Sequence, residues 1–146
     1  MNEEKRSSLV KRLDKFLDDQ ECYTPSPLVS LDQFFDGNDD VGSIGCNLFE
    51  HPGIQRFRDV LSELEEHEDI SKVWVIAKQH DWKPGWPHSD EVIFLTSLNV
   101  DTIEEKISIL EPDEVYDVYS DFKAVDLDNK AISAQDGEKF IGAWWD

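Results

Sequence analysis

Two segments in the middle of the chain are apolar at almost every position, which predicts buried β-strands. In residues 73–78, Trp74 and Ile76 would lie on one face, while three smaller apolar side chains lie on the other. Residues 92–96 repeat the pattern, with Phe94 in the middle. Strands that are apolar on both faces belong inside a sheet that is covered on both sides. We therefore expect these two strands at the centre of a sheet.

Other segments carry apolar residues at the three- and four-residue spacing of amphipathic helices. They are residues 9–17, a short helix after Ser30, a helix from Pro52 to about His67, and a helix that begins after Asp101 or Thr102 and ends before Pro112. Ser30 and Gln33 have the spacing of a capping box, and Gly37 would follow the end of that short helix. Pro52 would occupy a first helical position.

The last part of the chain predicts further strands joined by turns. Residues 115–119, 122–127 and 140–145 have strand patterns, and residues 128–130 and 135–137 have turn patterns. This order is typical of an α+β fold: a mixed, mostly antiparallel sheet packed with three to four helices. A chain of 146 residues, 39% of them hydrophobic, is long enough to form a single domain with its own core.

The pattern divides the chain into an N-terminal amphipathic helix, a linker and an acidic α+β domain, at residues 1–20, 21–29 and 30–146. Pro25 and Pro27 mark the linker. The N-terminal helix would either dock on the domain or form a semi-detached arm used in dimerisation. Its apolar stripe favours docking.

Acidic side chains outnumber basic ones by 33 to 14, which gives a formal net charge of −19. This sign excludes ordinary electrostatic binding to nucleic acid or anionic membranes, because both need clustered Lys and Arg. The first 20 residues hold five acidic and five basic side chains, so the surplus lies beyond them. It either keeps the surface soluble or forms a face for a basic partner, such as a nuclease or another cationic protein.

Compartment signals are few. Cys22 and Cys46 are too few for a disulfide framework. The N-terminus carries charge from residue 3 onward, so it lacks the apolar region of a secretory signal. No stretch has the apolar length of a transmembrane helix. We therefore expect a cytoplasmic protein.

The loop at residues 36–47 has a partial calcium-binding pattern. Asp36, Asn38 and Asp40 match the first three ligand positions of an EF-hand. Val41 stands where the sharp-turn Gly belongs, and Asn47 stands where a bidentate Glu is required. A turn-rich loop, in which Asp and Asn side chains bind nearby backbone amides, explains the pattern better.

No other spacing is typical of catalysis. The four histidines have no zinc-binding spacing, and there is no nucleophile elbow and no phosphate-binding loop. We expect no cofactor and no catalytic residue. The enzyme alternative is a metal in the 36–47 loop, or a His–carboxylate pair in the 80–90 loop, where His80-Asp81 and His88-Ser89-Asp90 lie.

The loop at residues 80–90 is the most distinctive stretch. Trp82 and Trp86 stand beside rigid prolines, so they would either anchor a partner or fold back and plug the end of the sheet. Trp144 and Trp145 face the same choice, and plugging is favoured for them. The candidate partner-binding residues are Asp39, Asp40, Glu63, Glu65, Glu66, Glu68, Trp82, Trp86, His88 and Asp90.

A set of short motifs resembles an uncharacterised bacterial protein family. The motifs are Gly37-Asn38-Asp39-Asp40, Gly42-Ser43-Ile44-Gly45-Cys46-Asn47, Trp86-Pro87-His88-Ser89-Asp90, Pro112-Asp113-Glu114-Val115 and Trp144-Trp145-Asp146. The resemblance covers about residues 28–146 and leaves the N-terminal helix as an addition. It implies no catalytic residue. In size and acidity the chain is also broadly similar to immunity proteins that neutralise bacterial toxins.

These observations lead us to expect an acidic bacterial binding protein, with an immunity-type inhibitor of a basic toxin as its specific form. One coherent carboxylate-rich face would steer the cationic partner, and Trp82 and Trp86 would anchor it. A regulatory protein-interaction module is a further alternative. The sequence leaves the partner's identity and the oligomeric state open.

Overall fold

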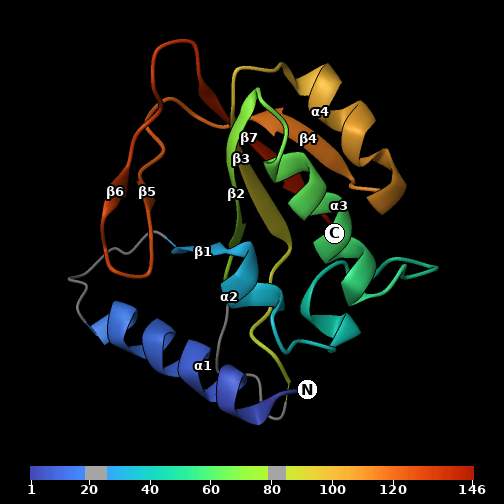
Figure 1. The fold of residues 1–146 in the computed structure, drawn as a ribbon, viewed down its shortest axis with the longest axis vertical. Coiled ribbons are helices and arrows are strands. Elements are labelled where there is room, and N and C mark those ends of the chain that lie inside the picture. The colour runs from blue at the N-terminus through green and yellow to red at the C-terminus, as the bar shows by residue number, and fades with distance from the viewer. Residues whose placement is uncertain (19–25, 79–84) are drawn as a thin grey trace.

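A five-stranded antiparallel sheet organises the molecule, and the two strongest predicted strands lie inside it. The structure is a computed structural model that describes residues 1–18, 26–78 and 85–146. The strand order is β1-β2-β3-β7-β4, so β2 and β3 each have a strand on both sides. Every neighbouring pair in this sheet is antiparallel. The prediction of a mostly antiparallel α+β domain is confirmed (Figure 1).

The elements follow the predicted segments with shifts of a few residues at their ends. The strands are β1 (Leu28–Ser30), β2 (Ile70–Ile76), β3 (Glu91–Thr96), β4 (Glu114–Asp117), β5 (Ala124–Val125), β6 (Ala131–Ile132) and β7 (Lys139–Trp144). The helices are α1 (Glu3–Asp18), α2 (Leu31–Phe35), α3 (Ile54–Glu65) and α4 (Val100–Ile107), with short 3-10 turns η1 (Val41–Ser43) and η2 (Ser108–Leu110). The predicted linker at 21–29 overlaps β1, because Leu28 and Val29 are apolar and pair with Ile76 and Val75.

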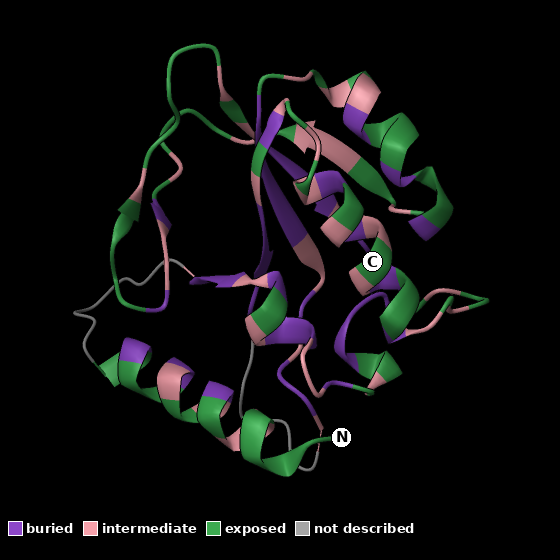
Figure 2. Cartoon of the chain, in the orientation of Figure 1, coloured by how far each residue is buried: buried purple, intermediate pink, exposed green. Residues whose placement is uncertain are grey.

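The sheet has an apolar layer on each face. Val73 and Val75 of β2 belong to the larger cluster, which also contains buried residues of α2, α3 and α4. Trp74 and Ile76 belong to the second cluster, against which residues near the β5–β6 hairpin pack. In Figure 1 the hairpin and the helices α3 and α4 lie on opposite sides of the sheet, and in Figure 2 the central strands are almost wholly buried.

Local capping explains where the helices begin. The capping box of Ser30 and Gln33 is present, as predicted. Two other predicted starts are wrong. Gly53, at φ +98°, is the N-cap of α3, so Pro52 lies before the helix, because that backbone conformation is not helical. Asn99 caps α4 in place of Asp101 or Thr102, since its side-chain oxygen accepts the Thr102 N–H at 2.9 Å.

Helix α1 docks on the domain, which is the favoured alternative. Leu9, Leu13 and Phe16 are buried along one stripe. Two of its basic side chains form salt bridges with the domain. Lys5 Nζ lies 2.5 Å from Asp36, and Arg12 lies 3.1 Å from Asp128. None of the helices in the described residues combines the length and the apolar character needed to cross a bilayer.

Candidate partner-binding surface

Trp86 is a core residue, so its predicted role as an exposed anchor is wrong. Its side chain is 1% exposed. Its backbone N–H donates to Asp40 Oδ2 at 2.9 Å, which draws the chain inward at this point. The indole belongs to the larger core cluster, which also contains Ile44 and Val92. Trp82 lies outside the described residues.

The two C-terminal tryptophans differ from each other. Trp145 is 1% exposed, and its Nε1 donates to the carbonyl of Leu110 at 2.8 Å. Its ring meets that of Phe57 edge to face at 5.5 Å. Trp145 therefore plugs the core, as predicted. Trp144 is half-buried, and its Nε1 lies 3.4 Å from Asp90 Oδ2.

The loop at residues 36–47 uses its acidic and amide side chains to hold itself together. Asp40 accepts the backbone N–H of Gly42 as well as that of Trp86, both at 2.9 Å. Asn38 is buried and accepts the Asp40 N–H at 2.9 Å. Within the described part of the chain, no group of three or more His, Cys, Asp or Glu side chains has the arrangement of a metal site.

Asp36, the remaining carboxylate of the partial calcium pattern, is ion-paired. It lies 2.5 Å from Lys5 Nζ and 3.7 Å from Arg58 Nη1. The hydrogen bond from Lys5 is the largest influence on it, and together with the charges of Lys5 and Arg58 it lowers the pKa of the Asp36 carboxyl. Asp36 therefore serves to hold α1 against the domain.

His88 and Asp90 contact different partners. His88 Nδ1 lies 3.3 Å from the carbonyl of Gly42, and the His88 carbonyl accepts the N–H of Lys78 at 2.9 Å. Asp90 faces Trp144 through Oδ2 and lies 3.8 Å from Lys78 Nζ through Oδ1. Both residues thus join the segment before β3 to its neighbours.

The predicted acidic residues fall into two groups, so a single patch beside the tryptophan loop is wrong. Asp39 lies next to the N-terminus in space, because its carboxylate pairs with the Met1 amino group at 2.7 Å. Glu63 and Glu66 lie at the far end of α3, whose 12 residues span about 18 Å. Figure 1 shows this helix running away from the loop after α2.

Glu65 belongs to the second group in sequence but has a structural role. Its carboxylate accepts the backbone N–H of Val73 at 3.0 Å and lies 3.7 Å from Lys72 Nζ. It therefore fastens α3 to the first half of β2. Glu63, Glu66 and Glu68 remain exposed.

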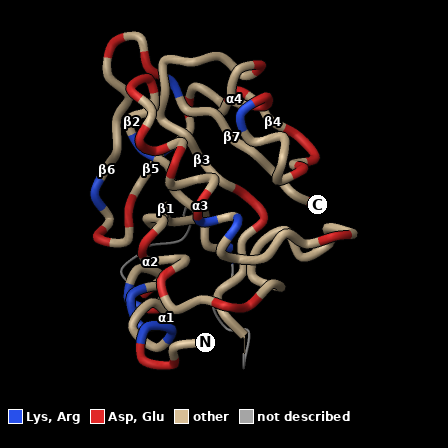
Figure 3. Tube along the Cα trace, turned by 45° about the vertical axis from the view of Figure 1, so that its right-hand side comes forward, with Lys and Arg blue, Asp and Glu red and all other residues tan. Residues whose placement is uncertain are grey.

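The structure extends this second group with acids that the sequence reasoning missed. Helix α4 packs against α3 and β4, so the exposed carboxylates of residues 101–114 lie on α4, on β4 and on the segment between them, next to α3. Figure 3 shows these acidic positions along α4 and β4. We call the combined set the acidic face: Asp59, Glu63, Glu66, Glu68, Asp101, Glu104, Glu105, Glu111, Asp113 and Glu114. Helical spacing predicts the exposure of the α4 acids, because Ile103 and Ile107 point inward.

A groove of about 460 Å³ crosses the acidic face. The apolar residues that line it are Val60 and Leu64 of α3 and Ile109, which is 52% exposed. The polar residues that line it are Arg56, Asp59, Glu63, Glu66, His67 and Lys106. The groove therefore combines three carboxylates and the cations Arg56 and Lys106 with an apolar strip.

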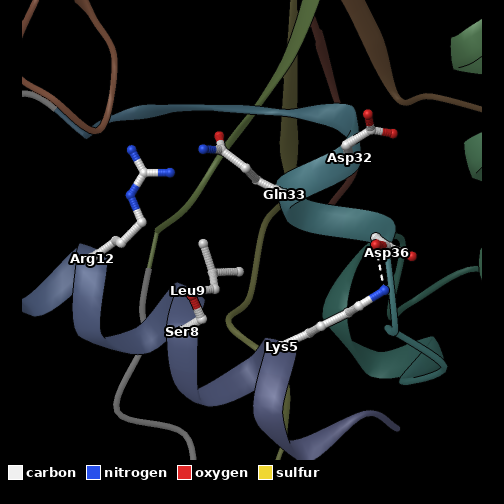
Figure 4. A pocket seen from close by; sticks show the side chains of 7 residues that line it. All are labelled: Lys5, Ser8, Leu9, Arg12, Asp32, Gln33 and Asp36. Atoms are coloured by element: carbon white, nitrogen blue, oxygen red, sulfur yellow. Dashed lines mark hydrogen bonds and ion pairs between the residues drawn. The ribbon is translucent and has the colours of Figure 1, made fainter.

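A second pocket, of about 270 Å³, is the seam along which α1 docks (Figure 4). Leu9 forms its floor, and Lys5 and Arg12 project across it. Both cations are already paired, with Asp36 and Asp128. The pocket is therefore a packing feature of the α1 interface, and its charges are largely neutralised.

Comparison with known proteins identifies the family. Residues 4–142 match the sequence profile of the Uncharacterized protein YfbO family. The chain belongs to this family. A YfbO family protein of Escherichia coli strain K12, "Uncharacterized protein YfbO", is 27% identical over 124 residues, which is 84% of this chain and 85% of that protein. No solved structure matches.

The extent of the match corrects one expectation. The resemblance seen in the motifs begins near residue 28 and leaves the N-terminal helix outside. The YfbO profile begins at residue 4, so it includes α1. This agrees with the docking of α1 through buried Leu9 and Leu13. The helix is part of the family's domain.

Proposed function

We propose that this YfbO family protein is a binding protein whose acidic face takes a basic protein partner, in the manner of an immunity-type inhibitor. One observation carries the proposal. Within residues 1–18, 26–78 and 85–146, none of the ten carboxylates of the acidic face lies in a salt bridge. Two acids elsewhere on the domain, Asp36 and Asp128, are paired with cations of α1.

The carboxylates of the acidic face place like charges close together. Carboxylates that repel one another destabilise the folded chain, and a cationic partner would relieve that repulsion. Such a field also accelerates encounter with a cationic protein, and the acceleration falls as salt rises. The apolar strip of the groove would add short-range affinity, because a partner that covers it buries apolar area.

If the acidic side chains only kept the protein soluble, their number would matter but their positions on the surface would not. The proposal is therefore tested with two variants that each lose three negative charges, one on the acidic face and one elsewhere. The surface variant carries Glu63→Gln, Glu66→Gln and Glu104→Gln. The matched control carries Asp18→Asn, Asp121→Asn and Asp136→Asn, which replace exposed acids on α1 and in two turns outside the acidic face.

Each protein is immobilised and used to capture partners from a lysate of the source organism, first at low salt and then at about 1 M, where the Debye length is about 3 Å. We expect the wild type and the control to retain one basic protein, the surface variant to lose it, and high salt to release it. Equal capture by both variants, or an acidic captured protein, would contradict the proposal.

A further inference from the structure

Phe49 is the most exposed large hydrophobic residue in the described part of the chain. Its side chain is 99% exposed, against 83% for Tyr119 and 53% for Val41. It lies in a turn at residues 46–50, in the loop that projects beside α3 in Figure 1. An aromatic ring held wholly in water contributes no burial to the fold, so the domain gains nothing from its position.

The loop that carries Phe49 is firmly built on the domain. Leu48 turns inward against the larger core cluster, and its N–H donates to the carbonyl of Gly45 at 3.0 Å. Gly45 is buried at φ +62°, and a Cβ there would lie 2.9 Å from the ring of Phe57. The turn therefore fixes Leu48 as the inward residue and Phe49 as the outward one.

His51 braces the other side of the same loop. Its Nδ1 accepts the N–H of Gly53 at 2.9 Å, so Nε2 carries the proton and donates to the carbonyl of Ile44 at 2.8 Å. Its ring packs on Phe57 with centroids 5.3 Å apart. The loop is therefore closed across its base, and the exposed ring projects from a supported turn.

The position of the loop relates Phe49 to the acidic face. The loop leads through Gly53 into α3, whose exposed side carries Arg56 in the first turn, Asp59 in the middle, and Glu63 and Glu66 toward the far end. Glu50, next to Phe49, is also exposed. An apolar anchor and a negative surface thus lie on one helix and its entry loop. A partner that fits both has an apolar pocket with Lys or Arg around it.

We propose that Phe49 is the anchor residue that inserts into an apolar pocket of the basic protein partner. The inference rests on the proposed function, and it replaces the tryptophans with the residue that the fold exposes. Buried aromatic anchors dominate dissociation of protein complexes. Phe49→Ala should therefore speed dissociation at least about tenfold, while the dependence of association on salt stays unchanged.

Site-specific photo-cross-linking tests the anchor and identifies the partner in the same experiment. A benzoylphenylalanine probe is placed at position 49 in the full chain and irradiated in cells of the source organism. The matched control carries the probe at position 119, since Tyr119 is also an exposed aromatic side chain. Adducts are identified by mass spectrometry. We expect one adduct with a basic protein at position 49 and none with that protein at position 119.

The outcomes separate this inference from the proposed function. An adduct at position 49 that disappears with Glu63→Gln, Glu66→Gln and Glu104→Gln supports both. If no protein cross-links at position 49 while the acidic face still captures a basic protein, the anchor is wrong and the proposed function stands. Identical adducts at both positions, or an adduct with lipid, would also overturn the anchor.

Discussion

The backbone N–H of Trp86 donates a 2.9 Å hydrogen bond to the side chain of Asp40, which lies 46 positions earlier in the chain. The other oxygen of the same carboxylate accepts the N–H of Gly42 at 2.9 Å. Ser89 reinforces the junction, because its N–H donates to the carbonyl of Ser43 at 2.7 Å. One carboxylate therefore joins the loop after α2 to the segment before β3.

Removal of this junction should destabilise the fold. Asp40→Ala deletes two hydrogen bonds to a charged group, and we expect the free energy of unfolding to fall by about 2 kcal/mol. Asp39→Ala is the control, because the ion pair of Asp39 with the N-terminus is exposed. We expect this change to alter stability by less than about 0.5 kcal/mol. Urea denaturation of the two variants measures the difference. Equal losses would show that the junction has no special role.

A comparison of Trp86 with Trp145 measures how much the hydrogen bond of a buried indole contributes to stability. Both are 1% exposed. Trp145 Nε1 donates to Leu110, whereas Trp86 Nε1 has no hydrogen-bond partner among the described residues. Both changes to Phe reduce volume, but only Trp145→Phe leaves a buried carbonyl without its donor. We expect Trp145→Phe to cost about 1–2 kcal/mol more than Trp86→Phe in denaturant unfolding.

An equal cost for the two Trp→Phe variants would contradict this account. Trp86 variants report on the fold. Because the side chain is buried, Trp86→Ala reports on folding stability, with an expected loss of about 3–5 kcal/mol. Faster dissociation from a partner would follow from partial unfolding and would be no measure of an anchor.

Docking of α1 should weaken in acid through Asp36. Lys5 and Arg58 lower the pKa of this carboxyl in the folded state below its ordinary value of 3.8. A carboxyl with a depressed folded pKa stabilises the fold fully above its unfolded pKa, and the contribution is lost as the pH falls through the folded pKa. The unfolding free energies of the wild type and of Asp36→Asn should therefore differ at neutral pH and converge below about pH 4. A constant difference over this range would contradict the role of the ion pair.

Gly142 should tolerate a side chain only when Tyr116 is shortened. A Cβ at Gly142 would overlap the Tyr116 ring, whose hydroxyl donates to Glu91. We expect Gly142→Ala to destabilise the chain by about 1–3 kcal/mol. In a Tyr116→Ala background the same change should cost much less, because the clash is gone. A double-mutant cycle of unfolding free energies measures this coupling, and additive effects would show that the two positions are independent.

The central strands, the helices and the capping box follow from local signals. Two runs of apolar residues place β2 and β3 inside the sheet, and Ser30 with Gln33 starts α2. The errors at Pro52 and at Asp101 or Thr102 are also local, because Gly53 and Asn99 compete for the same capping position. These features depend on side chains a few residues apart, so periodicity and capping chemistry predict most of them.

The candidate site depends on contacts between residues that are far apart in the sequence. The sequence determined the sign and the size of the charge, and it identified the acids on α3. Only the tertiary structure placed α4 beside them, turned Trp86 into the core through Asp40, and left Phe49 in solvent on a turn closed by His51. An apolar side chain lowers its free energy wherever burial is available, so composition cannot distinguish an anchor from a core residue. That difference is set by residues that are distant in the chain and adjacent in space.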